Sequence, residues 1–164
     1  NTLVAFLIGG ATLSFNFKAV DSSGKLIYDG NGTVITKDNS YRMETADVIL
    51  VSDGTLKGIY QKSIDEIVLQ PVGEASADYA GLMDNPFAIL QDAANYYEVI
   101  TWKGGKKVTS AAPGTLPDKI QLKSKSGATY TLQINSAEHT DSPNSALFSL
   151  RPEDYPSAVV TDLR

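Results

Sequence analysis

The residue with the clearest capacity for catalysis in this 164-residue chain is its single histidine, His139. Imidazole is the side chain that most readily exchanges a proton near neutral pH, so a general base would be sought here first. His139 lies in the polar run Glu138–Asp141, and such a run is typical of a surface loop. The chain has no cysteine, which excludes a disulfide, a thiolate nucleophile and a thiolate metal site. Catalysis at His139 is therefore the less favoured interpretation.

The sequence motifs of common enzyme classes are missing as well. The chain contains no Gly-x-Ser-x-Gly nucleophile elbow, no glycine-rich phosphate loop followed by Lys-Ser or Lys-Thr, and no paired-histidine metal motif. Its aspartates lie mostly beside glycine, serine or asparagine, where they stabilise turns, so a glycosidase-type carboxylate pair has no support beyond the presence of acids. The sequence predicts a protein that is not an enzyme and that uses no metal or cofactor.

Length and composition favour one domain over residues 1–164, since a chain of this size buries roughly 70% of its unfolded surface. Charged residues make up 20% and apolar residues 42%, ordinary values for a globular protein. The net charge of −5 argues against nucleic acid and anionic lipid headgroups as electrostatic partners. We expect a monomer.

Turn signals recur at intervals often of about 8 to 12 residues, the spacing of an antiparallel meander. They are Ser22–Gly24, Asp29–Gly32, Lys37–Asn39, Asp53–Gly54, Lys62–Ser63, Gly104–Gly105 and Ser126–Gly127. Between them, apolar and polar residues alternate, as Leu13, Phe15 and Phe17 do with their neighbours. The same alternation occurs over Tyr41–Thr45, Ile120–Lys123 and Thr129–Ile134. These segments are predicted to be strands with one solvated face.

The segment Val48–Val51 is apolar on both faces, which predicts a central strand covered on its second side. Asp53-Gly54 then provides the tight turn into the strand that holds Ile59 and Tyr60. We expect a helix to provide the cover.

The best helix candidate begins at Asn85, a good N-cap, with Pro86 at the first helical position. Phe87, Leu90 and Ala94 form its apolar stripe. Loops are expected over Gly73–Gly81, Ala111–Pro117 and Ser136–Ser145. The N-terminal apolar run Leu3–Ile8 is expected to be a helix end or a strand, too short to cross a bilayer.

The interior of such a curved sheet can be either filled or hollow. A single twisted sheet with one short helix has few side chains to fill its interior, so either the sheet collapses or a cavity remains. Each aromatic residue taken alone is better explained as ordinary core. Sequence patterns leave both outcomes open, and we favour a wall that binds an apolar ligand.

The order of these motifs resembles the family of outer-membrane lipoprotein carriers, the LolA-type periplasmic proteins, over most of the chain. The motifs are Leu13–Phe17 with the Gly24 turn, Gly30–Val34, Ser40–Glu44, Val51–Gly54 leading to Ile59-Tyr60, Asn85–Leu90, and Phe148–Pro152 followed by Val159–Arg164. Two positions depart from the family pattern. Gly58 stands where the family has an aromatic residue, and Lys37–Asn39 replaces a basic residue before a proline that is linked to lid closure.

The resemblance implies an α+β fold in which a strongly curved antiparallel sheet forms a half-open β-barrel, with short helices as a lid over its concave face. It also implies a periplasmic protein, its signal peptide removed, that carries lipoprotein acyl chains from the inner to the outer membrane. An inner-membrane release complex and an outer-membrane acceptor would be its partners by resemblance.

The predicted ligand-binding residues combine a wall and a lid. Phe87 and Leu90 on the helix are expected to close over Phe15, Phe17, Met43, Leu50, Ile59 and Ile67. Acyl chains of lipoproteins or another lipid would be the ligand. The alternatives are an envelope lipid sensor, a LolB-like acceptor on the same scaffold, and a structural interaction domain without a ligand.

Overall fold

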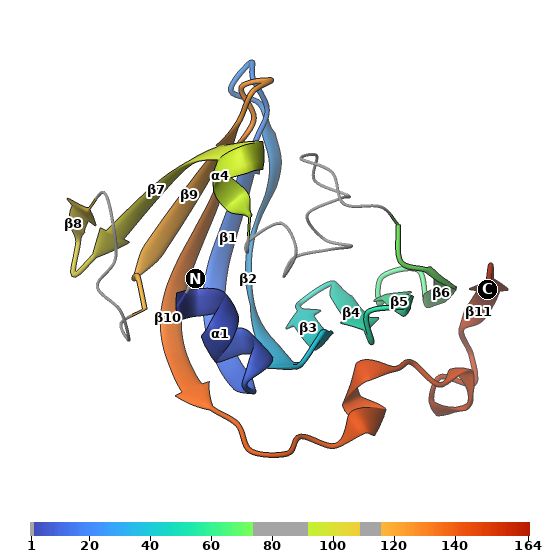
Figure 1. Cartoon of the computed structure of the whole chain (residues 1–164). Helices are drawn as coiled ribbons and strands as arrows, with labels where there is room; N and C mark the ends of the chain where they lie inside the picture. The colour runs from blue at the N-terminus through green and yellow to red at the C-terminus, as the bar shows by residue number, and fades with distance from the viewer. Residues whose placement is uncertain (1, 74–91, 109–115) are drawn as a thin grey trace.

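The computed structural model describes residues 2–73, 92–108 and 116–164, and over these residues one sheet dominates (Figure 1). Helix α1 (Thr2–Ile8) precedes strands β1 (Ala11–Val20), β2 (Leu26–Lys37), β3 (Ser40–Thr45), β4 (Val48–Ser52), β5 (Leu56–Gln61) and β6 (Glu66–Pro71). The short helix α4 (Ala93–Tyr96) is followed by β7 (Tyr97–Lys103), β8 (Lys106–Val108), β9 (Lys119–Ser124) and β10 (Thr129–His139). Two 3-10 turns, η1 (Ser145–Phe148) and η2 (Pro152–Asp154), lead to β11 (Val159–Asp162).

The described strands form a single curved and unclosed sheet in the order β11-β6-β5-β4-β3-β2-β1-β10-β9-β7-β8. Neighbouring strands are antiparallel except β11, which runs parallel to β6. The predicted fold class is confirmed: a strongly curved sheet forms a half-open barrel with few short helices (Figure 1). The predicted lid helix from Asn85 to Leu90 lies outside the described residues.

Strand β1 lies near the middle of the sheet, and each of its two neighbours has one irregularity that favours curvature, because Asn135 of β10 and Ile27 of β2 are extra residues opposite β1. Its pairing with β10 shifts register between Ser14 and Phe15, and its pairing with β2 shifts between Ala19 and Val20. Bulges of this kind bend a strand and increase its twist. The sheet can therefore wrap around a concave face.

The turn at Asp53-Gly54 lies where the sequence predicts it, between β4 and β5. The Asp53 carboxylate accepts hydrogen bonds from the backbone N–H groups of Thr55 at 2.9 Å and Leu56 at 2.8 Å. Gly54 has a φ of 92°, which a residue without Cβ adopts at little cost. Local chemistry alone thus defines this hairpin.

The turn predicted at Asp29–Gly32 is wrong, because this segment lies inside the long strand β2. Gly30 pairs with Phe17 and Gly32 pairs with Phe15 across the β1–β2 ladder. A Cβ at Gly30 would meet the Tyr28 side chain, and a Cβ at Gly32 would meet the Glu44 carbonyl oxygen of β3, so these glycines permit close packing rather than a turn.

The loop predicted over Ser136–Ser145 is also partly wrong, because β10 continues to His139. Two side-chain hydrogen bonds accompany the extension, joining the hydroxyls of Ser14 and Ser136 at 2.9 Å and of Thr12 and Thr140 at 2.6 Å. The polar composition of this segment is typical of a loop, but the segment is a strand whose solvent-facing hydroxyls form hydrogen bonds to β1.

Helix α1 covers part of the concave face, where the sequence suggested a helix end or a strand. Leu3 and Leu7 are buried in a cluster with side chains from β1, β3, β4, β7, β9 and β10. The buried Thr36 hydroxyl donates to the Leu7 carbonyl at 2.6 Å, and the Asp38 N–H donates to the Ile8 carbonyl at 2.8 Å. These bonds satisfy carbonyls at the helix C-terminus. Within the described parts of the chain, no helix has the length and hydropathy to cross a membrane.

The C-terminal segment, residues 140–158 between β10 and β11, packs on the convex face of the sheet. The second side of β4 is therefore covered by this segment rather than by an α-helix. Ile49 and Val51 of β4 form a second cluster with Ile67, Leu69 and Leu150. The prediction that Val48–Val51 is buried on both faces is confirmed.

Candidate functional site

The strand register aligns six apolar side chains in one row across the concave face. The row consists of Leu13, Val34, Met43, Leu50, Ile59 and Val68, each directly paired with the next. Six strands at about 4.8 Å spacing give a row about 24 Å long along the curve of the sheet. One membrane leaflet has a hydrocarbon depth of about 15 Å, so the row matches or exceeds the length of an acyl chain.

Five of the eight predicted wall and lid residues share this concave face. Phe15 and Phe17 alternate with polar residues on β1, on the same side as Leu13, and Met43, Leu50 and Ile59 belong to the row itself. Phe17 also packs near Tyr28, with 6.0 Å between ring centroids. The structure therefore brings these five together on one surface.

Ile67 does not belong with them, which corrects the predicted wall. It pairs with Tyr60, whereas Ile59 pairs with Val68, so Ile67 lies on the convex side of the sheet. There it is completely buried against the C-terminal segment. In a strand with apolar residues at consecutive positions, the face of each residue depends on register, and Val68 takes the concave position.

The remaining two predicted residues, Phe87 and Leu90, lie outside the described residues. Sequence reasoning missed Leu13, Val34 and Val68 as wall residues. Leu13 belongs to the alternating run that was recognised in the sequence, so that signal was available. Val34 and Val68 have no such signal, since only the pairing of strands shows which face they share with Leu50.

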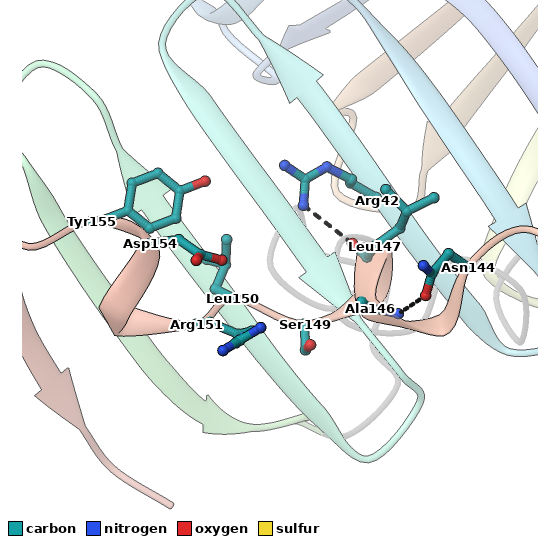
Figure 2. Close-up of a pocket in the computed structure, with 9 residues that line it drawn as sticks. All are labelled: Arg42, Asn144, Ala146, Leu147, Ser149, Leu150, Arg151, Asp154 and Tyr155. Carbon is teal, nitrogen blue, oxygen red and sulfur yellow. Dashed lines mark hydrogen bonds between the residues drawn. The ribbon is translucent and has the colours of Figure 1, made fainter.

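The convex face carries a small pocket of about 200 Å³ between the sheet and the C-terminal segment (Figure 2). Its lining comprises Arg42, Asn144, Ala146, Leu147, Ser149, Leu150, Arg151, Asp154 and Tyr155. The Arg42 guanidinium donates to the Leu147 carbonyl at 3.1 Å and to the Glu44 carboxylate at 2.8 Å. This arginine thereby ties β3 to the C-terminal segment.

A second contact between the sheet and the C-terminal segment is centred on Asp65, in the β5–β6 turn. The hydroxyls of Tyr60 and Ser157 donate to its carboxylate at 2.7 and 2.6 Å. These two bonds, with that of Ser157 the larger contribution, lower the pKa of Asp65. The bond to the Asp65 carboxylate raises the pKa of Tyr60. The Tyr60 ring also packs against Tyr155, with centroids 4.4 Å apart.

His139 is the last residue of β10, where it pairs with Ala11, and its ring is largely exposed. Its Nε2 lies 3.0 Å from the Asp141 carboxylate. In the part of the chain that the structure describes, no group of three or more His, Asp or Glu side chains is placed to hold a metal ion.

Comparisons with known proteins give a fold but no family. No protein-family model matches the chain, and no curated protein matches it. An uncharacterized conserved protein from Thermus thermophilus superimposes with a TM-score of 0.56 at 9% identity, covering 96% of this chain and 93% of that chain. A domain from Vibrio parahaemolyticus described as a putative outer membrane lipoprotein-sorting protein domain gives a TM-score of 0.34 at 8% identity, covering 86% of this chain and 89% of that chain. The first similarity shows a shared fold, and the second is too low to carry an argument.

Proposed function

We propose that the concave face binds acyl chains of lipoproteins, or of a related lipid, and that the protein carries them through the periplasm from the inner to the outer membrane. The supporting observation is the apolar row from Leu13 to Val68. Leu13 and Leu50 of this row are buried in the cluster with α1, and its other four residues are half-buried. Phe15 and Phe17 extend this surface toward the hairpin between β1 and β2. Phe87 and Leu90 stay predicted lid residues.

The energetics of such a carrier are balanced. Burying an acyl chain of about 16 carbons contributes roughly 13 kcal/mol at about 0.8 kcal/mol per methylene, close to the cost of extracting the same chain from a membrane. Uptake and delivery can then both proceed, with the direction decided by partner proteins at each membrane. A binding surface without fixed charges suits this exchange.

A lipid sensor or an anchored acceptor would use the same surface, whereas a structural interaction domain would hold no ligand. Lipid retention separates the binding functions from the structural one. Protein purified gently from a lipid-containing host is expected to carry acyl lipid in native mass spectrometry. Transfer of that lipid from donor to acceptor vesicles then separates a carrier from a sensor.

The critical variant replaces a half-buried residue of the row by a larger side chain. Ile59→Trp is expected to reduce bound lipid at least tenfold, because the indole occupies the space of a guest chain. Ile27→Trp is the matched control, since Ile27 is exposed. If both variants retain lipid to the same extent, with unchanged far-ultraviolet circular dichroism, the concave row is not the binding surface.

A further inference from the structure

The hairpin formed by β7 and β8 lies at one end of the described sheet (Figure 1), and its sequence is rich in lysine. Lys103, Lys106 and Lys107 are exposed around its Gly104-Gly105 turn. Lys119 of the neighbouring strand β9 places its Nζ 4.7 Å from the centroid of the Trp102 ring. We refer to these four lysines and Trp102 as the lysine hairpin.

The lysine hairpin has a charge opposite to that of the whole chain. The carboxylate of Asp118, next to Lys119, accepts a hydrogen bond from the Gly104 N–H at the turn of the hairpin. Four lysines and one aspartate give +3, so the rest of a chain with a net charge of −5 carries −8. Glu98, the acid on β7, lies at the far end of that strand and pairs with Lys123.

The strand register places like charges next to one another. Lys103 pairs directly with Lys106, and Lys107 and Lys119 both pair with Trp102, one from each side. Like charges at directly opposed positions of a ladder are destabilising, and this applies to Lys103 and Lys106, whereas Trp102 separates Lys107 from Lys119. The arrangement therefore works against the stability of the isolated hairpin, and an anionic partner would relieve the repulsion.

We propose that the lysine hairpin docks the protein on a membrane surface rich in anionic phospholipid. Lysines near such a surface are attracted to its headgroups, and tryptophan is the side chain most typical of the membrane interface. The −8 carried by the rest of the chain is repelled by the same surface, so the protein would approach with this edge first. The proposal does not depend on lipid binding at the concave face.

The net charge of the chain argued against anionic headgroups as partners, and the hairpin qualifies that inference. Attraction at a surface depends on charges within about 8 Å at physiological salt, so a local excess of lysine acts even when the whole molecule is acidic. Summed charge carries no information on where lysines gather, whereas the sheet brings residues 103 and 119 to one edge.

Vesicle co-sedimentation of the complete chain tests the proposal. Wild-type protein is expected to bind phosphatidylcholine vesicles that contain phosphatidylglycerol, and not pure phosphatidylcholine. Binding should disappear in about 0.5 M salt. Lys106→Gln/Lys107→Gln is expected to weaken binding about 25-fold, or about fivefold for each charge removed.

The matched control is Lys18→Gln/Lys25→Gln, which removes two exposed lysines near the β1–β2 hairpin and should change binding less than about twofold. Equal losses in the two double variants would overturn the proposal, as would wild-type binding that ignores phosphatidylglycerol. Binding to heparin or RNA without binding to anionic vesicles would assign the hairpin to another polyanion and also overturn it. Ile59→Trp should bind these vesicles like the wild type, so failure of the carrier function and failure of the docking site are distinguishable.

Discussion

Gly58 and Leu150 provide a direct test of how the C-terminal segment is held on the convex face. Gly58 pairs with Val51 and Leu69 in the sheet, and Leu150 lies directly above it. A Cβ added at Gly58 would lie 3.0 Å from Leu150 Cδ1 and 3.2 Å from its Cβ and Cγ. Leu150 is 7% exposed and packed in a cluster, so it has little freedom to retreat.

In the wild-type background, Gly58→Ala is therefore expected to lower the free energy of unfolding by about 1 to 2 kcal/mol, the usual cost of overpacking. Leu150→Ala alone should cost about 2 to 5 kcal/mol, because it leaves a cavity. With Leu150 truncated to alanine, only its Cβ remains, 3.2 Å from the added methyl, and the vacated space lets it move by a few tenths of an ångström. Gly58→Ala should then stabilise by about 0.5 to 1 kcal/mol, since alanine restricts the unfolded chain more than glycine does.

The assay is urea unfolding of the wild type, both single variants and the double variant. The reversal of sign corresponds to a coupling energy of about 2 kcal/mol between the two positions. A coupling energy below about 0.5 kcal/mol would refute the reasoning, because it would mean that Leu150 does not occupy the space above Gly58. The same result would remove the physical explanation for a glycine at position 58.

Two further predictions concern polar contacts at each end of the chain. Thr36→Val should cost about 0.5 to 1.5 kcal/mol in urea unfolding, because it removes the hydroxyl that donates to the Leu7 carbonyl while the Gly10 N–H still donates to it, and a cost near zero would contradict this role. The contact of Asp65 with Tyr60 and Ser157 should be fully formed above the ordinary carboxyl pKa and should weaken as the pH falls through the lowered pKa of Asp65. It should also weaken at alkaline pH, as the pH rises through the raised pKa of Tyr60, because the phenolate cannot donate. Hydrogen exchange of the β11 amides, corrected for intrinsic rates, should accelerate relative to that of the β1 amides at both acidic and alkaline pH. Ser157→Ala should raise the pH at which the acid-induced acceleration is half complete. If β11 exchange follows β1 exchange at every pH, the contact does not hold β11 in place.

The placement of Ile67 shows how far sequence patterns reach into the site. Alternation assigned Phe15 and Phe17 to one face correctly, because each has polar neighbours. The residues Ile67–Leu69 are all apolar, so they show no alternation from which to predict a face of the sheet. Only the pairing with β5 shows which of them lie on the concave face. A one-residue difference in register separates a wall residue from one buried beneath the C-terminal segment.

The turns and the strand-rich character of this protein follow from the sequence by itself, because an Asp-Gly turn or an alternating strand depends on residues a few positions apart. The curvature of the sheet, the segments that pack on its two faces and the neighbours of each side chain depend on tertiary structure. Gly58 is explained by Leu150, and Lys119 joins the lysine hairpin only because β9 pairs with β7. These contacts join residues far apart in the chain, and a sequence pattern over a few neighbouring residues does not predict them.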